Sequence, residues 1–132
     1  MRLVALFLAA LLATAPAAAQ PIDPSFEIVN QSGRTVFQIY ANAVTQREWG
    51  RDHLGASVLR PGGAIQVRLP PTGGCRTDIR VVFTGGASTE RRNVNTCTER
   101  RFVIGPNGIF AQAGPPAGPP AGPQGGDKTA GG

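Results

Sequence analysis

The sequence predicts an all-β protein, a small antiparallel sandwich or barrel of about six or seven strands with one disulfide. Three observations point to this fold class. Apolar and polar residues alternate at period two between residues 26 and 105, no part of that region keeps a helical period, and Gly- or Pro-rich turns interrupt it repeatedly. Without its two ends the chain has about 80 residues, which suits one small domain.

The expected strands follow one another along the chain, separated by turns such as Pro61-Gly62, where Pro presets φ and Gly accepts a positive φ. In the second strand Phe37, Ile39 and Ala41 should share one face, and Val36, Gln38 and Tyr40 the other. Only residues 45–54 could hold a short helical turn. The expected strands are Phe26–Val29, Thr35–Ala41, Ser57–Leu59, Ala64–Leu69, Cys75–Phe83, Ser88–Asn95 and Arg101–Ile104.

The two ends of the chain differ from this middle region. Residues 1–19 predict a secretory signal peptide, because an arginine precedes the apolar run Leu3–Leu12, and Ala17 and Ala19 give the small-x-small pattern before the cut. That run is shorter than the roughly 20 residues of a membrane-spanning helix, so we expect no transmembrane anchor after cleavage. An uncleaved N-terminal anchor is the alternative. Residues 20–25 form a short leader, and the Gly/Pro-rich residues 106–132 predict a disordered tail.

The chain has two cysteines, Cys75 and Cys97. In an exported domain such a pair most simply forms a disulfide, because the compartment is oxidising. Closing a loop of about 23 residues should stabilise the fold by roughly 3 kcal/mol through the unfolded state. We therefore predict a structural disulfide.

Several motifs of the predicted domain resemble a family of small exported bacterial proteins. The shared residues are Asn30-x-x-Gly33, Trp49-Gly50-x-Asp52-x-Leu54-Gly55, Leu59-x-Pro61-Gly62, Cys75-x-x-Asp78-Ile79-Arg80-Val81-Val82-Phe83 and Cys97. Members are single β-sandwich-like domains with a signal peptide and no established function, so the resemblance implies that fold for the region from Asn30 to Cys97. Gly85-Gly86 stands where the family usually carries Asp-Gly. Some relatives carry enzyme names such as argininosuccinate lyase, but that lyase is a large helical tetramer, which this chain is too short to build.

The loop of residues 46–55 contains the single Trp and the single His of the sequence, Trp49 and His53. Glu48, Asp52 and His53 could converge on a metal ion, although such a site usually needs a further ligand. The structural alternative is that Trp49 and Leu54 close the end of the sandwich while Asp52 caps backbone N–H groups. As a candidate interaction loop it offers Arg47, Trp49, Arg51, Asp52 and His53.

Positive charge is the remaining signal, with 13 Lys and Arg against 8 Asp and Glu and a net charge of +5. If neighbouring strands align Arg68, Arg80 and Arg92 on one outward face, their guanidinium groups would suit phosphate, sulfate or carboxylate. Nucleic acid is not expected, because few aromatic residues accompany the charges. The alternative is a solvated face without a ligand.

Catalytic motifs are missing from the sequence. It contains no Gly-x-Ser-x-Gly elbow and no His-Glu-x-x-His, and both cysteines are expected to be oxidised, so we expect neither an enzyme nor a cofactor. We expect an exported binding or interaction module of the cell envelope, periplasmic or secreted, whose partner is an envelope protein or an anionic polymer. The alternatives are a small periplasmic inhibitor of lysozyme or protease type, acting through the 46–55 loop, and a metal-dependent enzyme centred on His53.

Overall fold

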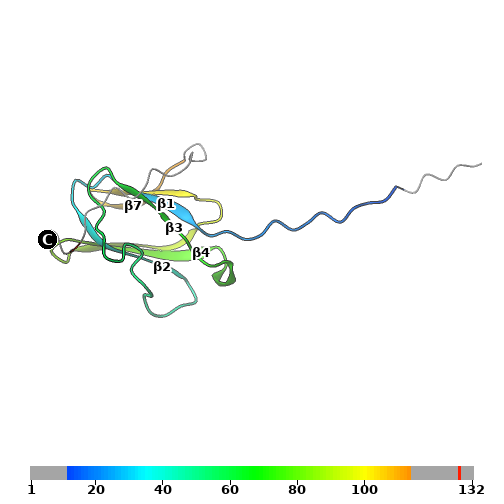
Figure 1. Cartoon of the computed structure of the whole chain (residues 1–132), viewed down its shortest axis with the longest axis horizontal. Helices are drawn as coiled ribbons and strands as arrows, with labels where there is room; N and C mark the ends of the chain where they lie inside the picture. Colours follow the sequence, from blue (N-terminus) through cyan, green and yellow to red (C-terminus); the bar gives the residue numbers. More distant parts are fainter. Residues whose placement is uncertain (1–11, 114–127, 129–132) are drawn as a thin grey trace, which may run out of the picture.

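The fold consists of two β-sheets packed as two layers (Figure 1). The structure is a computed structural model, and it describes residues 12–113 and Lys128. One sheet has the strand order β3-β1-β6-β7 and the other β2-β4-β5, and within the described residues the two sheets do not close into a barrel. The predicted all-β sandwich is confirmed. The strands are β1 (Phe26–Asn30), β2 (Val36–Ala43), β3 (Ala64–Val67), β4 (Arg76–Phe83), β5 (Ser88–Asn95), β6 (Arg101–Gly105) and β7 (Gly108–Ala111), and a 3-10 turn covers Pro71–Gly73.

The core lies between the two layers and is built by the alternation seen in the sequence. Phe26 of β1 and Phe102 of β6 are fully buried and meet edge to face, with ring centres 5.1 Å apart. Because successive side chains of a strand point to opposite faces, one face of each sheet supplies the apolar residues. The other fully buried large apolar side chains of this core are Ile28, Val36, Ile39, Leu59, Val67, Ile79, Val81 and Ile104.

One strand pair departs from the expected antiparallel arrangement. β1 pairs with β3 in antiparallel fashion but with β6 in parallel fashion, with Ile28 opposite Phe102. β6 follows a connection that leaves the β2-β4-β5 sheet and enters the other one. A crossing of this kind, unlike a hairpin, does not force antiparallel pairing.

A bulge in β2 changes which of its side chains reach the core. The register against β4 shifts between Val36 and Gln38, so Phe37 is the extra residue. Val36 and Ile39 are both fully buried, whereas Phe37 is half-buried. The expectation that Phe37 lies on the same face as Ile39, with Val36 on the other, is therefore wrong.

The domain extends further along the chain than the sequence suggested. β7 pairs with β6, and Ile109 is buried in the core. The domain therefore ends near Ala111, and a tail beginning at residue 106 is a wrong boundary. The expected strand at residues 57–59 is reduced to a single bridge between Val36 and Leu59. Residues 1–11, most of the expected signal peptide, and residues 114–127 and 129–132 of the expected tail lie outside the described part of the chain.

The predicted disulfide is confirmed. The sulfur atoms of Cys75 and Cys97 lie 2.08 Å apart, and the two cysteines stand just before β4 and just after β5. The bond therefore closes the open end of the β4–β5 hairpin. Disulfides of this kind are typical of proteins that fold in oxidising compartments. Among the described residues no helix is long and apolar enough to cross a membrane.

Candidate functional site

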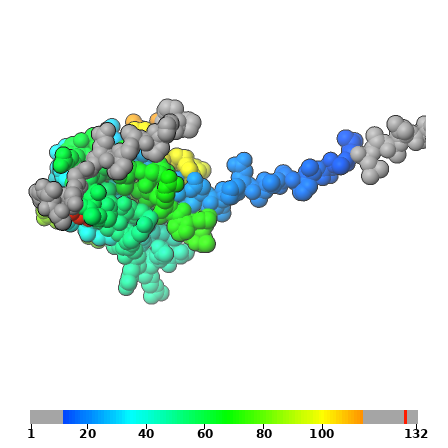
Figure 2. All heavy atoms as spheres, in the orientation of Figure 1, coloured from blue at the N-terminus to red at the C-terminus, as the bar shows by residue number. Residues whose placement is uncertain are grey.

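The loop between β2 and the Val36–Leu59 bridge projects from the domain at its tip and then returns along the free edge of β2. In Figure 2 it forms the blue-green protrusion on the lower side of the domain. We call residues 44–55 the 44–55 loop. On its return, the backbone N–H of His53 donates to the carbonyl of Ile39 over 2.7 Å. The carboxylate of Asp52 accepts the N–H groups of Ile39 and Leu54, each at 3.0 Å. Asp52 thus takes the place of a neighbouring strand.

Asn42 braces the exposed tip of the same loop. Its side chain is buried, donates to the carbonyl of Glu48 and accepts the N–H of Gly50 at 3.2 Å. Residues 44–48 are exposed to solvent, so these two hydrogen bonds hold a protruding segment at its base. The loop contains no helix, although a short helical turn was conceivable there.

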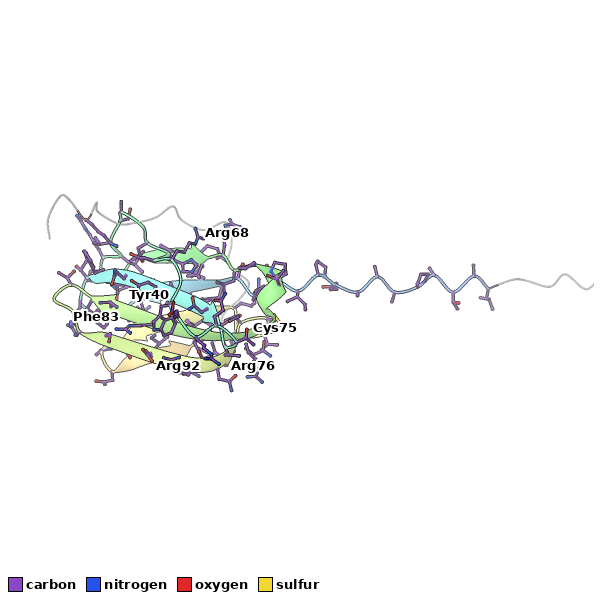
Figure 3. All side chains as sticks on the ribbon, turned by 90° about the horizontal axis from the view of Figure 1, so that it is seen from below. Tyr40, Arg68, Cys75, Arg76, Phe83 and Arg92 are labelled. Carbon is purple, nitrogen blue, oxygen red and sulfur yellow. A yellow bond between two sulfur atoms is a disulfide. The ribbon has the colours of Figure 1, made fainter. Side chains whose placement is uncertain are left out.

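Trp49 lies on the outer face of the β2-β4-β5 sheet rather than at the end of the sandwich. Its ring is half-buried, 6.2 Å from the ring of Tyr40, with the guanidinium of Arg92 4.8 Å from its centre. Figure 3 shows Tyr40 and Arg92 on the same side of that sheet. The expectation that Trp49 closes the end of the sandwich is wrong, because the alternation of β2 turns Tyr40 outward and Trp49 packs on it.

Arg80 and Arg92 lie on neighbouring strands, but their charges are matched locally. Arg92 contacts Glu90 at 2.8 Å and Asp78 at 3.1 Å, and Arg80 lies 3.6 Å from Glu90. Two guanidinium groups thus face two carboxylates. This outer face offers little net attraction for an anion.

Arg68 does not join them. It follows β3 in the other sheet, and Figure 3 places it on the opposite side of the domain from Arg92. The expected row of Arg68, Arg80 and Arg92 on one face is therefore wrong. The cause is strand order, because β3 pairs with β1 and not with β4 or β5.

A cleft of about 550 Å³ is lined by the end of β2, by the 44–55 loop and by the residues that follow β3. We call it the Arg51–Arg68 cleft. β2 and β3 are each an edge strand of their sheet. Gly73 closes one end against Ala43, because a Cβ on Gly73 would stand only 2.8 Å from the Cβ of Ala43. The lining residues are Pro24, Ala41, Asn42, Ala43, Thr45, Gln46, Gly50, Arg51, His53, Arg68, Leu69, Pro70, Thr72, Gly73, Gly74 and Thr77.

Arg51 and Arg68 both line this cleft and come from different segments of the chain. Arg51 comes from the 44–55 loop and Arg68 from the segment that follows β3. Both side chains are exposed, and neither takes part in an ion pair among the described residues. The cleft thus presents two guanidinium groups whose donors are available to a ligand.

His53 also lines the cleft. Burial lowers the pKa of His53 below its ordinary value of 6.5, and the positive charge of Arg51 lowers it further, while the backbone of Ala41 and the charge of Asp52 oppose the shift. The imidazole is therefore neutral at pH 7. In that state it offers a hydrogen-bond donor and an acceptor and adds no charge to the cleft.

The residues of the candidate interaction loop are distributed over four places. Arg51 and His53 face the cleft, Arg47 stands at the exposed tip, and Trp49 packs on the outer sheet face, while Asp52 turns to the edge of β2. Among residues 12–113 and Lys128, Glu48, Asp52 and His53 do not gather into a metal-ligand cluster. Sequence reasoning missed that Arg51 and Arg68 line one cleft, because they belong to separate segments of the chain and no local pattern connects them.

The fold and the cleft define a disulfide-linked, two-sheet β domain with a cationic cleft. Comparisons of the chain with protein-family models, with curated proteins and with solved structures found no match.

Proposed function

We propose that this protein is an exported, non-catalytic binding module of the cell envelope that holds an anionic ligand in the Arg51–Arg68 cleft. The observation that carries the proposal is the contrast between its arginines. Arg51 and Arg68 line a cleft without a carboxylate partner among the described residues, whereas Arg80 and Arg92 face Glu90 and Asp78. Guanidinium groups bind carboxylate, phosphate and sulfate through paired hydrogen bonds.

The remaining walls limit the kind of anion. Leu69 and Pro70 supply apolar surface, and Thr72 and Thr77 are polar lining residues. A volume of about 550 Å³ falls within the range of small-molecule sites. The ligand that fits is therefore a small organic anion, or the terminal unit of an anionic polymer, with its charged group between the arginines.

The location in the cell envelope rests on two supports. Residues 1–19 have the pattern of a signal peptide, and the Cys75–Cys97 disulfide fits an oxidising compartment. A periplasmic or secreted protein meets anionic polysaccharides and phospholipid headgroups, both of which carry groups that suit arginine.

The test compares two double variants of equal charge. Arg51→Gln/Arg68→Gln alters the cleft, and Arg80→Gln/Arg92→Gln removes the same charge from the outer face. Retention of the purified chain on immobilised heparin in a salt gradient, and its affinity for citrate by calorimetry, are the measurements. We expect the first variant to elute at clearly lower salt than the wild type and to lose at least tenfold in citrate affinity, with the second close to wild type. Equal losses in both variants, or none in either, would contradict the proposal.

A second function is favoured by the 44–55 loop. Its exposed tip, braced at the base by Asn42, has the form of a segment that inserts into the cleft of a target enzyme. An inhibitor of this kind would reduce lysozyme or trypsin-like activity at stoichiometric concentration. Arg47→Ala at the tip would remove that inhibition and leave citrate binding unchanged.

A further inference from the structure

Lys128, the single lysine of the chain, makes three contacts of different chemistry with the domain. Its backbone N–H donates to the carbonyl of Ala56 over 2.7 Å. Its ammonium nitrogen lies 2.5 Å from Oδ2 of Asp52 and 4.5 Å from the centre of the Phe37 ring. Lys128 lies within residues 106–132, for which the sequence predicts a disordered tail.

The surface that receives Lys128 is held in place by its own hydrogen bonds. Oδ1 of Asp52 accepts the two backbone N–H groups of Ile39 and Leu54, which leaves Oδ2 for the ammonium. The bulge in β2 takes the Phe37 ring away from the core, where a cation can approach its face. The side chains of Lys128 and Asp52 are only 16% and 15% exposed, so the pair is largely withdrawn from water.

We propose that Phe37, Asp52 and Ala56 form a docking site for a lysine side chain, and that the chain's own Lys128 occupies it in the native protein. A carboxylate oxygen, an aromatic face and a backbone carbonyl together recognise a primary ammonium and the N–H group of the same residue. We call these three residues the lysine site. This inference is independent of the proposed anion binding.

The chain itself is the occupant that the connectivity favours. Lys128 follows Ala113 by 15 positions, a length that reaches roughly 50 Å when extended. A tether of this length holds the lysine at an effective concentration on the order of millimolar, which a second copy in dilute solution does not match. Docking also joins the C-terminal segment to Asp52, which stands between the cleft residues Arg51 and His53.

The experiment measures how readily the Lys128 amine of the full mature chain is acylated. Because the chain has one lysine, mass spectrometry of the peptide containing residue 128 follows a single ε-amine during reaction with an acetylating ester. Phe37→Leu removes the aromatic face and keeps every charge, Asp52→Asn removes the carboxylate, and Glu48→Gln is the matched control in the same loop. We expect at least a tenfold faster reaction in the first two variants, and a wild-type rate in the control.

Three outcomes would overturn the proposal. The first is a wild-type Lys128 that reacts as fast as a free peptide of the same sequence. The second is a Phe37→Leu variant that folds, by circular dichroism, and reacts at the wild-type rate; it decides the matter where Asp52→Asn fails to fold. The third is protection that disappears on dilution, since a lysine from a second copy would then be the occupant. Protection that is independent of concentration supports docking within one chain.

Discussion

Removal of the disulfide should lower the free energy of unfolding of the domain by an amount that follows from the length of the loop that the bond closes. The bond links residues 22 positions apart and closes the end of the β4–β5 hairpin. For a loop of about 23 residues the chain-entropy relation gives about 3 kcal/mol at 25 °C. Domains of this size are stable by roughly 5–15 kcal/mol, so the loss is a large fraction of the total. At about 4–8 °C per kcal/mol, the thermal midpoint should fall by roughly 12–24 °C.

The perturbation is the double variant Cys75→Ala/Cys97→Ala. Alanine is chosen instead of serine because it adds no hydroxyl group that would lack a hydrogen-bond partner. Both cysteines are half-buried, so the packing contribution is small and the entropy of the unfolded chain dominates. The measurement is urea-induced unfolding followed by circular dichroism without reductant, with the oxidised wild type as reference. A loss below about 1 kcal/mol would refute the reasoning, because the β4–β5 segment would then remain closed in the unfolded state without the bond.

Three further predictions concern single residues. Burial is the main cause that lowers the pKa of His53, and the positive charge of Arg51 is the next. As the pH falls through 6.5, the unfolded chain therefore binds a proton that the folded protein does not yet bind. The free energy of unfolding should therefore be highest above pH 6.5 and should decrease as the pH falls from 6.5 to the lowered pKa. Urea titrations at several pH values should show a weaker dependence of this free energy on pH in His53→Gln than in the wild type. The same pH dependence in both proteins would refute this prediction. Phe102→Ala should cost about 3–5 kcal/mol in chemical denaturation, since the side chain is fully buried, whereas Phe110→Ala, 47% exposed, should change stability by less than about 0.5 kcal/mol. Asn42→Ala should destabilise the protein by about 1 kcal/mol and speed tryptic cleavage within the 44–55 loop; an unchanged digestion rate would show that its two hydrogen bonds do not hold the loop.

The strands were predictable from the sequence because alternation is a local property. Cys75–Phe83 was expected and β4 runs from Arg76 to Phe83, with Ile79 and Val81 in the core. β7 was missed because Gly105-Pro106 was interpreted as the end of the domain, whereas Pro106 and Asn107 form the turn of a β6–β7 hairpin. The bulge at Phe37 was missed because a one-residue insertion leaves no mark in a pattern of apolar residues.

The candidate site was less accessible to sequence reasoning, because it depends on strand order and on packing between sheets. Alternation indicates that Arg80 and Arg92 face outward, but not that Arg68 belongs to the other sheet. One signal was present. Glu90 stands two positions before Arg92, on the same face of a strand, and that spacing favours the ion pair which the structure contains. The meeting of Arg51 with Arg68 in one cleft has no counterpart in local sequence.

The covering of the β2 edge has a consequence for behaviour at high concentration. Exposed sheet margins are where identical molecules add to one another and begin to form fibres. At Ile39 the outward-directed N–H and C=O groups already bond to Asp52 and His53, and those of Val36 bond to Leu59. A neighbouring molecule would have to displace the 44–55 loop and Leu59 before it could add a strand to this edge. The covered edge of β2 therefore opposes fibre formation, although the strand itself carries no charged residue or proline.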